Sequence, residues 1–197
     1  MKHLMLAAAF STGATAALAD AVEYEFDPSH AQVVFSYNHL GFSTTTGMFS
    51  GFEGEIMFDA DDPANSSVSV SMPVMSMFTG WEAREAHFMS GDFFGAEEGD
   101  MVTFTSTSIE VTGDNTANIT GDLTMNDVTK SVVLETTLNQ RGPFPFGPKQ
   151  GVDTLGLNAT TTLLRSDFGL GAFAPAVGDE VAVTISLEAW EATGDGS

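Results

Sequence analysis

Residues 117–138 read ANITGDLTMNDVTKSVVLETTL, a stretch in which apolar and polar side chains alternate on both sides of Asn126-Asp127. Alternation with a period of two indicates a strand with one buried face. Turn-forming residues between two such runs indicate an antiparallel hairpin. The stretch therefore predicts two neighbouring antiparallel strands.

The same alternation recurs along most of the chain. It covers residues 33–39, 48–58, 68–74, 155–163 and 181–187, with shorter candidate strands near Tyr24 and across 101–111. Turn signals separate these runs at 61–63, 113–115 and 178–179. Strands with a single apolar face must close into a barrel or pair as a sandwich. We expect an all-β fold of eight to nine antiparallel strands.

One segment departs from this pattern. Thr79-Gly80-Trp81-Glu82 has the spacing of a capping box, and good helix formers follow over residues 83–89 before Gly91. We expect one short helix with Thr79 as its N-cap. Trp81, Arg84, Glu85 and Phe88 would share one face of this helix, which would cap one end of the barrel.

The N-terminal residues have the features of a secretory signal. Lys2 precedes an apolar run from Leu4 to Leu18, and Ala17-Leu18-Ala19 fits the small-residue cleavage rule. The run is too short and too polar for a membrane span. We expect residues 1–19 to be a cleavable signal peptide and residues 20–197 to form a single exported domain.

Charge and composition exclude several classes of function. Cleavage after Ala19 would leave five Lys and Arg residues against 27 acidic residues, a net charge of −22. Such a surface repels phosphate backbones and anionic headgroups, so we expect neither nucleic-acid binding nor electrostatic membrane docking. The chain has no cysteine, which excludes a thiolate zinc site and a cysteine nucleophile.

Motifs for catalysis are weak. The chain contains no Gly-x-Ser-x-Gly elbow and no glycine-rich phosphate loop. Ser29 lies beside Asp27 and His30, but residues this close in sequence cannot form the usual bonded chain of three side chains. We therefore expect a protein that is not an enzyme.

The histidines offer an alternative of a different class, a metal-dependent enzyme that uses His30, His39 and His87. Neither a strand nor a helix spacing brings two of them together, and no carboxylate accompanies them at ligand spacing. His39 shares a strand face with Tyr37, so we expect it to point inward as a buried, hydrogen-bonded residue. We expect no metal and no cofactor.

Phenylalanine is unusually frequent, with 16 Phe against two Tyr. The informative ones lie outside the alternating strand positions. They would either line the mouth of an apolar cavity or plug the barrel ends as ordinary core. Both interpretations stay open for this set, which comprises Phe42, Phe78, Phe88, Phe93, Phe94, Phe144, Phe146, Phe168 and Phe173.

Four groups of motifs follow one another along the chain. The first group is Asp27-Pro28-Ser29-His30, Phe35, His39-Leu40-Gly41 and Gly47-x-Phe49. The second is Arg84-x-x-His87-Phe88-x-Ser90-x-Asp92-Phe93-Phe94 with Phe104-x-Ser106-Thr107. The third is Gly121-Asp122-Leu123-Thr124-Met125 with Val128-Thr129-Lys130, and the fourth is Arg165-Ser166-Asp167-Phe168-Gly169 with Val177-Gly178-Asp179-Glu180-Val181. In this order the four groups resemble the YceI-like family. The departures from the family pattern, Asn126-Asp127 and Glu97-Glu98-Gly99-Asp100, fall in expected turns.

The resemblance implies a lipocalin-like antiparallel barrel in the periplasm that holds a long polyisoprenoid or similar lipid along its axis. Family members are linked to isoprenoid pyrophosphates and to isoprenoid quinones. A pyrophosphate would need several cations, and only Arg84, Lys130 and Arg165 lie within family motifs. We therefore expect a neutral-headed ligand, such as a quinone, with one hydrogen bond from His39 or Arg84.

The resulting hypothesis is a lipid carrier, and the alternative is a stress-response barrel whose interior is filled by its own side chains. The oligomeric state is left open, with a homodimer as one alternative. The expected ligand-binding residues are Phe35, Tyr37, His39, Phe42, Phe52, Phe78, Trp81, Arg84, Phe88, Phe93, Phe94, Arg165 and Phe168.

Overall fold

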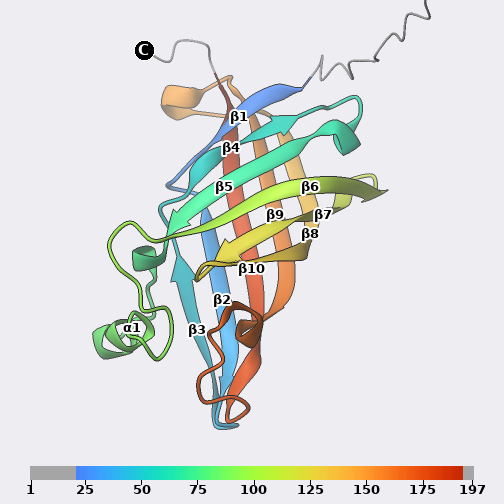
Figure 1. Cartoon of the computed structure of the whole chain (residues 1–197). Helices are drawn as coiled ribbons and strands as arrows, with labels where there is room; N and C mark the ends of the chain where they lie inside the picture. The colour runs from blue at the N-terminus through green and yellow to red at the C-terminus, as the bar shows by residue number, and fades with distance from the viewer. Residues whose placement is uncertain (1–20, 193–197) are drawn as a thin grey trace, which may run out of the picture.

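The computed structural model describes residues 21–192, so the expected signal peptide lies outside the described residues. Within them, ten antiparallel strands form one sheet, accompanied by one α-helix, α1 (Glu82–Phe88), and four short 3₁₀ turns (Figure 1). The strands are β1 (Val22–Phe26), β2 (Gln32–His39), β3 (Ser43–Phe49), β4 (Glu53–Phe58), β5 (Ser67–Pro73), β6 (Met101–Gly113), β7 (Thr116–Met125), β8 (Val128–Pro143), β9 (Asp153–Leu164) and β10 (Val177–Glu191).

Eight of these strands close into a barrel. The order β1-β4-β5-β6-β7-β8-β9-β10 returns to β1, because the end of β10 pairs with β1. The earlier part of β10 pairs with β2, which in turn pairs with β3. Figure 1 shows β2, β3 and the start of β10 running below the closed part of the barrel. The expected antiparallel barrel is confirmed, with β2 and β3 as two further strands.

The expected single run over residues 48–58 is two strands in the structure. β3 ends at Phe49 and β4 begins at Glu53. Gly51 lies between them with a φ of +72°, a backbone conformation that glycine adopts readily. The break allows a change of partner, since β3 pairs with β2 and β4 pairs with β1. The alternation changes phase at the break, because Phe49 faces the interior from β3 whereas Phe52 and Ile56 face it beyond Gly51. A single alternating run over 48–58 therefore does not describe both strands.

The single helix begins later than the capping box predicts. Its first residue is Glu82, the N-cap position is Trp81, and no side chain caps it. The prediction that Thr79 is the N-cap is wrong, because Gly80 has a φ of +76°, outside the helical region. The Thr79 hydroxyl donates to the Glu85 carboxylate, at 3.3 Å, and accepts no N–H of the helix. The Phe88 ring contacts the Tyr37 ring, with centroids 6.1 Å apart, so the helix lies against β2.

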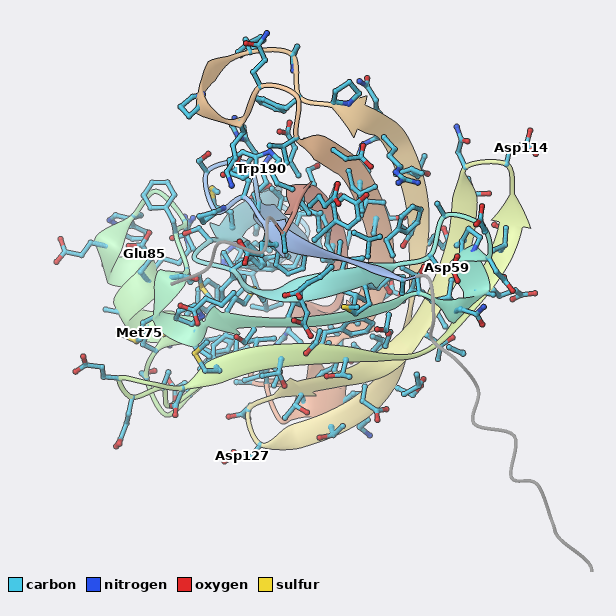
Figure 2. All side chains as sticks on the ribbon, turned by 90° about the horizontal axis from the view of Figure 1, so that it is seen from above. Asp59, Met75, Glu85, Asp114, Asp127 and Trp190 are labelled. Atoms are coloured by element: carbon cyan, nitrogen blue, oxygen red, sulfur yellow. The ribbon has the colours of Figure 1, made fainter. Side chains whose placement is uncertain are left out.

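The core consists of two clusters at different heights of the barrel. One cluster is built from Val33, Phe35, Phe49, Met77 and Val183, and the other from Tyr24, Ile56, Leu155 and Ala189. Figure 2 shows side chains projecting from both faces of the curved sheet, with the acidic Glu85, Asp114 and Asp127 at the periphery of the view. No helix within residues 21–192 is long and apolar enough to cross a bilayer.

A buried arginine holds the connection between β9 and β10. The Arg165 guanidinium donates to the backbone carbonyls of Leu170, Ala172, Val177 and Gly178, with three of these contacts at 2.8 Å. A guanidinium has five N–H donors, so four of them are used by the backbone. Residues 165–178 therefore close around one side chain.

At the opposite end of the strands, a buried tyrosine belongs to a polar network. The Tyr24 hydroxyl donates to Oδ2 of Asp153 at 2.8 Å, and Arg141 Nε donates to the same oxygen at 2.8 Å. Tyr24 is fully buried. Burial, together with the hydrogen bond to Asp153, raises the pKa of Tyr24 to about 12. The network joins β1, β8 and β9.

Replacing Arg165 with Met is expected to lower the free energy of unfolding by roughly 2–4 kcal/mol, because buried carbonyls lose charged donors. Urea denaturation followed by circular dichroism measures this change. Arg141→Met, which removes a more exposed guanidinium, is the control and should cost less. Equal losses in the two variants would contradict the anchoring role of Arg165.

Tyr24 is expected to make stability depend on pH in the alkaline range. Its folded pKa of about 12 lies above the value near 10 of an unfolded tyrosine. The contribution of Tyr24 to the free energy of unfolding is therefore complete below about pH 10 and is lost as the pH rises through about 12. The change amounts to roughly 2–3 kcal/mol. Urea denaturation over this range should show a smaller decline for Tyr24→Phe than for Tyr37→Phe. Equal declines in the stability of the two variants would show that Tyr24 does not cause the pH dependence.

Candidate ligand-binding cavity

The barrel interior contains two adjoining chambers, each with a volume of about 200 Å³. The outer chamber lies beside α1 and includes Phe88 in its lining. The inner chamber reaches the turn between β6 and β7 at Asp114. Five residues line both chambers, and we name this set the waist: Phe52, Val70, Phe104, Leu134 and Ile185.

The two chambers follow one another along the strands. On β10, Val181 and Val183 line the outer chamber, Ile185 belongs to the waist, and Leu187 lines the inner chamber. Ala189, two residues further on, is fully buried in the second core cluster. Residues of β9 repeat this order in the opposite direction. The cavity therefore runs lengthwise through the barrel.

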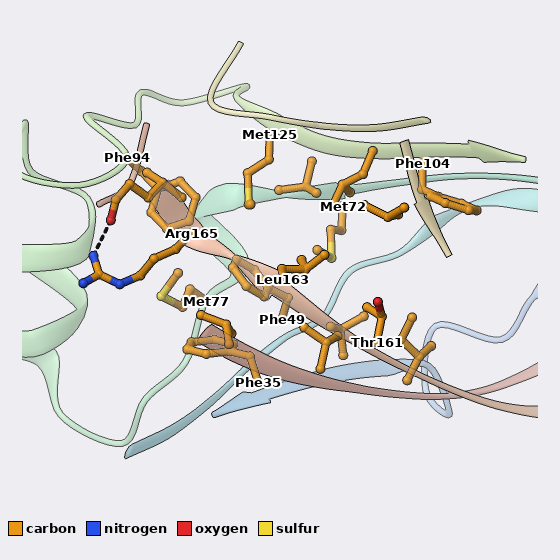
Figure 3. A pocket seen from close by; sticks show the side chains of 18 of the residues that line it. Phe35, Phe49, Met72, Met77, Phe94, Phe104, Met125, Thr161, Leu163 and Arg165 are labelled. Atoms are coloured by element: carbon orange, nitrogen blue, oxygen red, sulfur yellow. Dashed lines mark hydrogen bonds between the residues drawn. The ribbon is translucent and has the colours of Figure 1, made fainter. Parts of the chain in front are cut away.

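The outer chamber is lined almost entirely by apolar side chains. The exceptions are Tyr37, Thr103, Thr161 and Arg165. Figure 3 shows Arg165 at one end of the drawn side chains and Phe104 at the other, with aliphatic, methionine and aromatic side chains between them. Such a lining solvates hydrocarbon well and offers water few partners.

Seven of the thirteen residues expected from the sequence line this chamber. They come from β2, from the connection between β3 and β4, from α1 and the segment after it, and from the residue after β9. The fold brings these segments together around one space. The seven are Phe35, Tyr37, Phe52, Phe88, Phe93, Phe94 and Arg165.

The other six expected residues lie outside the lining of both chambers. The expectation that His39 points inward is wrong, because it is the last residue of β2 and is exposed where the strand runs past the chamber. Arg84 lies over the Trp81 ring, at 5.6 Å, and donates to the Thr79 carbonyl. Phe42, Phe78 and Trp81 are exposed, and Phe168 is buried elsewhere.

Sequence reasoning missed several lining residues on regular strand positions. Phe49, Phe104 and Met125 line the outer chamber from β3, β6 and β7, and Met72 lines it from β5. The alternation that predicts the strands also marks Met72 and Met125 as apolar and inward, whereas Phe49 is out of phase with the expected run over 48–58. They are not distinguishable by sequence from residues that fill a solid core.

Two rings of the cavity lie directly over glycines. Phe35 faces Gly47 across β2 and β3, and Phe104 lies over Gly121 of β7. A Cβ atom at either glycine would overlap the ring. Each ring therefore packs on bare backbone, and the glycine sets how far the ring extends into the cavity.

The three histidines do not form one site. His30 precedes β2 and His39 ends it, so they lie at opposite ends of the strand. His87 Nε2 lies 3.1 Å from an Asp92 carboxylate oxygen, and its ring packs 5.1 Å from the Phe93 ring. The metal-dependent enzyme that uses all three is therefore not supported by their placement.

A separate polar cluster occupies the turn between β1 and β2. His30 Nδ1 lies 2.5 Å from one Asp27 carboxylate oxygen, and Ser29 Oγ donates to the other at 2.7 Å. The hydrogen bond to Asp27 raises the pKa of His30. Ser29 and Asp27 both approach Nδ1, so the usual chain through both ring nitrogens is not formed. Asp27, His30 and Glu188 are the described side chains placed to share one cation.

Comparison with known proteins agrees with the motifs and the fold. A UPF0312 protein of Pseudomonas putida is 39% identical over 158 residues, which cover 79% of this chain and 80% of that protein. The crystal structure of Burkholderia cenocepacia BcnA matches with a TM-score of 0.73 and 25% identity, covering 85% of this chain and 99% of BcnA.

A polyisoprenoid binding domain from Saccharophagus degradans matches with a TM-score of 0.64 over 88% of this chain and 100% of that domain. At 10% identity this is a likeness of fold alone. The family model described as the YceI-like domain matches residues 24–189, from β1 to β10. The chain therefore belongs to the YceI-like family.

Proposed function

We propose that this protein is a carrier that binds a long isoprenoid or similar amphiphilic lipid inside the barrel without chemically changing it. The observation that supports this function best is the pair of apolar chambers joined at the waist. Two chambers in line suit an extended chain better than a compact molecule. The polyisoprenoid binding domain of Saccharophagus degradans has the same fold, which supports the same class of ligand.

The volume of the chambers favours a ligand over an interior filled by side chains. Well-packed cores contain few voids larger than a water molecule. An apolar cavity of about 150 Å³ already binds a small hydrocarbon, and each chamber here has about 200 Å³. Burying a prenyl chain gains roughly 25 cal/mol per Å² of apolar surface removed from water. Binding therefore needs few polar contacts.

A neutral headgroup fits the cations of the chain better than a pyrophosphate. Arg165 is the only Lys or Arg in the lining of either chamber formed by the described residues. Four of its N–H donors are bound to backbone carbonyls, so one remains for a ligand. A quinone carbonyl needs one such donor, whereas a pyrophosphate needs several converging cations.

The site of action that we propose is the periplasm, with residues 1–19 as the export signal and residues 20–197 as the mature lipid-binding domain. The strongly acidic composition, with 27 acidic residues, suits a protein that carries lipid between surfaces without adhering to anionic headgroups.

Native mass spectrometry of the full chain, expressed with its leader and purified from a periplasmic extract, tests the proposal. The expected result is a co-purified isoprenoid with an uncharged headgroup, released by organic extraction. In competition, an isoprenoid quinone should bind at least about tenfold more tightly than a prenyl pyrophosphate of equal chain length. Tighter binding of the pyrophosphate would refute the neutral headgroup, and uptake of neither lipid would refute the carrier.

Narrowing the waist should separate long ligands from short ones. Val70→Phe adds a ring where the chambers meet, so the affinity for a long-chain quinone should fall by about tenfold or more. A short prenyl analogue that fits the outer chamber should bind almost unchanged. Val133→Phe, at an exposed position outside the lining, is the matched control. Equal binding of the long ligand by Val70→Phe and Val133→Phe would show that the inner chamber is not used.

A further inference from the structure

Exposed apolar side chains gather where the outer chamber approaches the surface. Leu40 and Phe42 lie in the turn between β2 and β3, and Phe173 lies in the connection between β9 and β10. The two segments are joined by a hydrogen bond from the Leu40 N–H to the Ala176 carbonyl, at 3.1 Å. Figure 1 shows both at the lower end of the molecule. We name Leu40, Phe42 and Phe173 the rim.

The rim is connected to the cavity by a series of aromatic rings in edge-to-face and tilted contacts. Phe173 lies 6.0 Å from Phe93, Phe93 lies 5.2 Å from Phe88, and Phe88 lies 6.1 Å from Tyr37, measured between centroids. The last three rings line the outer chamber, whereas Phe173 is 56% exposed. A lipid tail leaving the chamber along these rings would emerge at the rim.

Two apolar residues of the rim adopt a backbone conformation that does not favour them. Leu40 has a φ of +56° and Phe173 a φ of +62°, in the left-handed region that bulky residues rarely adopt. Glycine or asparagine would adopt this conformation with less strain. Phe42, the third residue of the rim, is 90% exposed. Stability alone would favour other residues at these positions.

From these observations we propose that the rim docks on an electrically neutral lipid surface, where the ligand passes between the bilayer and the outer chamber. The proposal rests on the function proposed above and names the place where the lipid enters. Exposed aromatic and aliphatic side chains can insert into a neutral lipid surface without a cation on the protein.

Charge and area favour a lipid surface over a second copy of the chain. Two rims brought together would juxtapose two strongly acidic proteins, each with 27 acidic residues. Three side chains bury about 500 Å² at most, whereas a stable protein interface needs about 800 Å² from each partner. Asp92, Asp179 and Glu180 belong to the segments around the rim and disfavour anionic lipids. A weak, reversible contact with a neutral bilayer satisfies both constraints.

The test is flotation of the purified, full-length mature protein with phosphatidylcholine vesicles that contain no isoprenoid. The test variant is Phe42→Ser/Phe173→Asn, in which asparagine suits the left-handed backbone. Its bound fraction is expected to fall at least about fivefold. Phe146→Ser is the matched control, because Phe146 is 69% exposed in the connection between β8 and β9 and should bind like the unmodified protein. Thermal unfolding verifies that all three proteins are folded.

Lipid composition supplies a second criterion. Adding anionic phosphatidylglycerol should weaken flotation, and raising the salt concentration should restore it. Unchanged flotation of the double variant, or flotation only with anionic vesicles, would overturn the proposal. So would a dimer in sedimentation that the double variant alone loses, since the rim would then join two copies.

A separate measurement distinguishes failure of docking from failure of the carrier function. Quinone presented in detergent should bind equally to the unmodified protein and to the double variant, because the rim lies outside the cavity. Loss of this binding in the variant alone would place the rim in the binding site and overturn the docking proposal. Absence of binding in both would refute the carrier function and, with it, the role of the rim in lipid entry.

Discussion

The architecture depends on the pairing of β10 with two different strands. Residues Val177–Ser186 of β10 pair with β2, whereas Ala189, Trp190 and Glu191 pair with β1. Because β1 closes the barrel, each of its eight strands has a hydrogen-bonded neighbour on both sides. The pairing with β2 carries the sheet beyond this ring, and α1 lies against the extension. The interior is therefore a lengthwise cavity that is closed by strands along its middle and bordered by a helix and loops at its outer end.

Much of this fold was predictable because each strand presents one apolar face. Alternation in the hairpin around Asn126-Asp127 gave the correct strands, and the same rule identified most inward side chains. Alternation does not report where a strand changes partner or leaves the barrel. The break at Gly51 and the exposure of His39 both follow from such events. The N-cap was misplaced for another reason, since Gly80 adopts a positive φ and the helix cannot begin directly after Thr79.

The lining of the candidate cavity was predictable in part, and the residues that sequence reasoning missed were missed for a physical reason. Phe88, Phe93 and Phe94 stood out because they lie off the strands, and the structure places them in the outer chamber. Phe104 did not stand out, because a strand residue in a cavity wall has the same sequence pattern as one in a solid core. The role of Arg165 depends on backbone carbonyls five to thirteen residues away along the chain. No sequence pattern indicates that these carbonyls point toward its guanidinium.

The glycines beneath Phe35 and Phe104 have a consequence for how such barrels diverge. Neither Gly47 nor Gly121 belongs to the cavity lining, yet each determines the depth at which a lining ring lies. The dimensions of the cavity therefore depend on residues that lie behind its lining. Under the proposed carrier function, replacement of either glycine among relatives would change the length of lipid accommodated while every residue that lines the cavity stayed the same. Comparison of contact residues alone would then fail to identify which members of the family share a ligand.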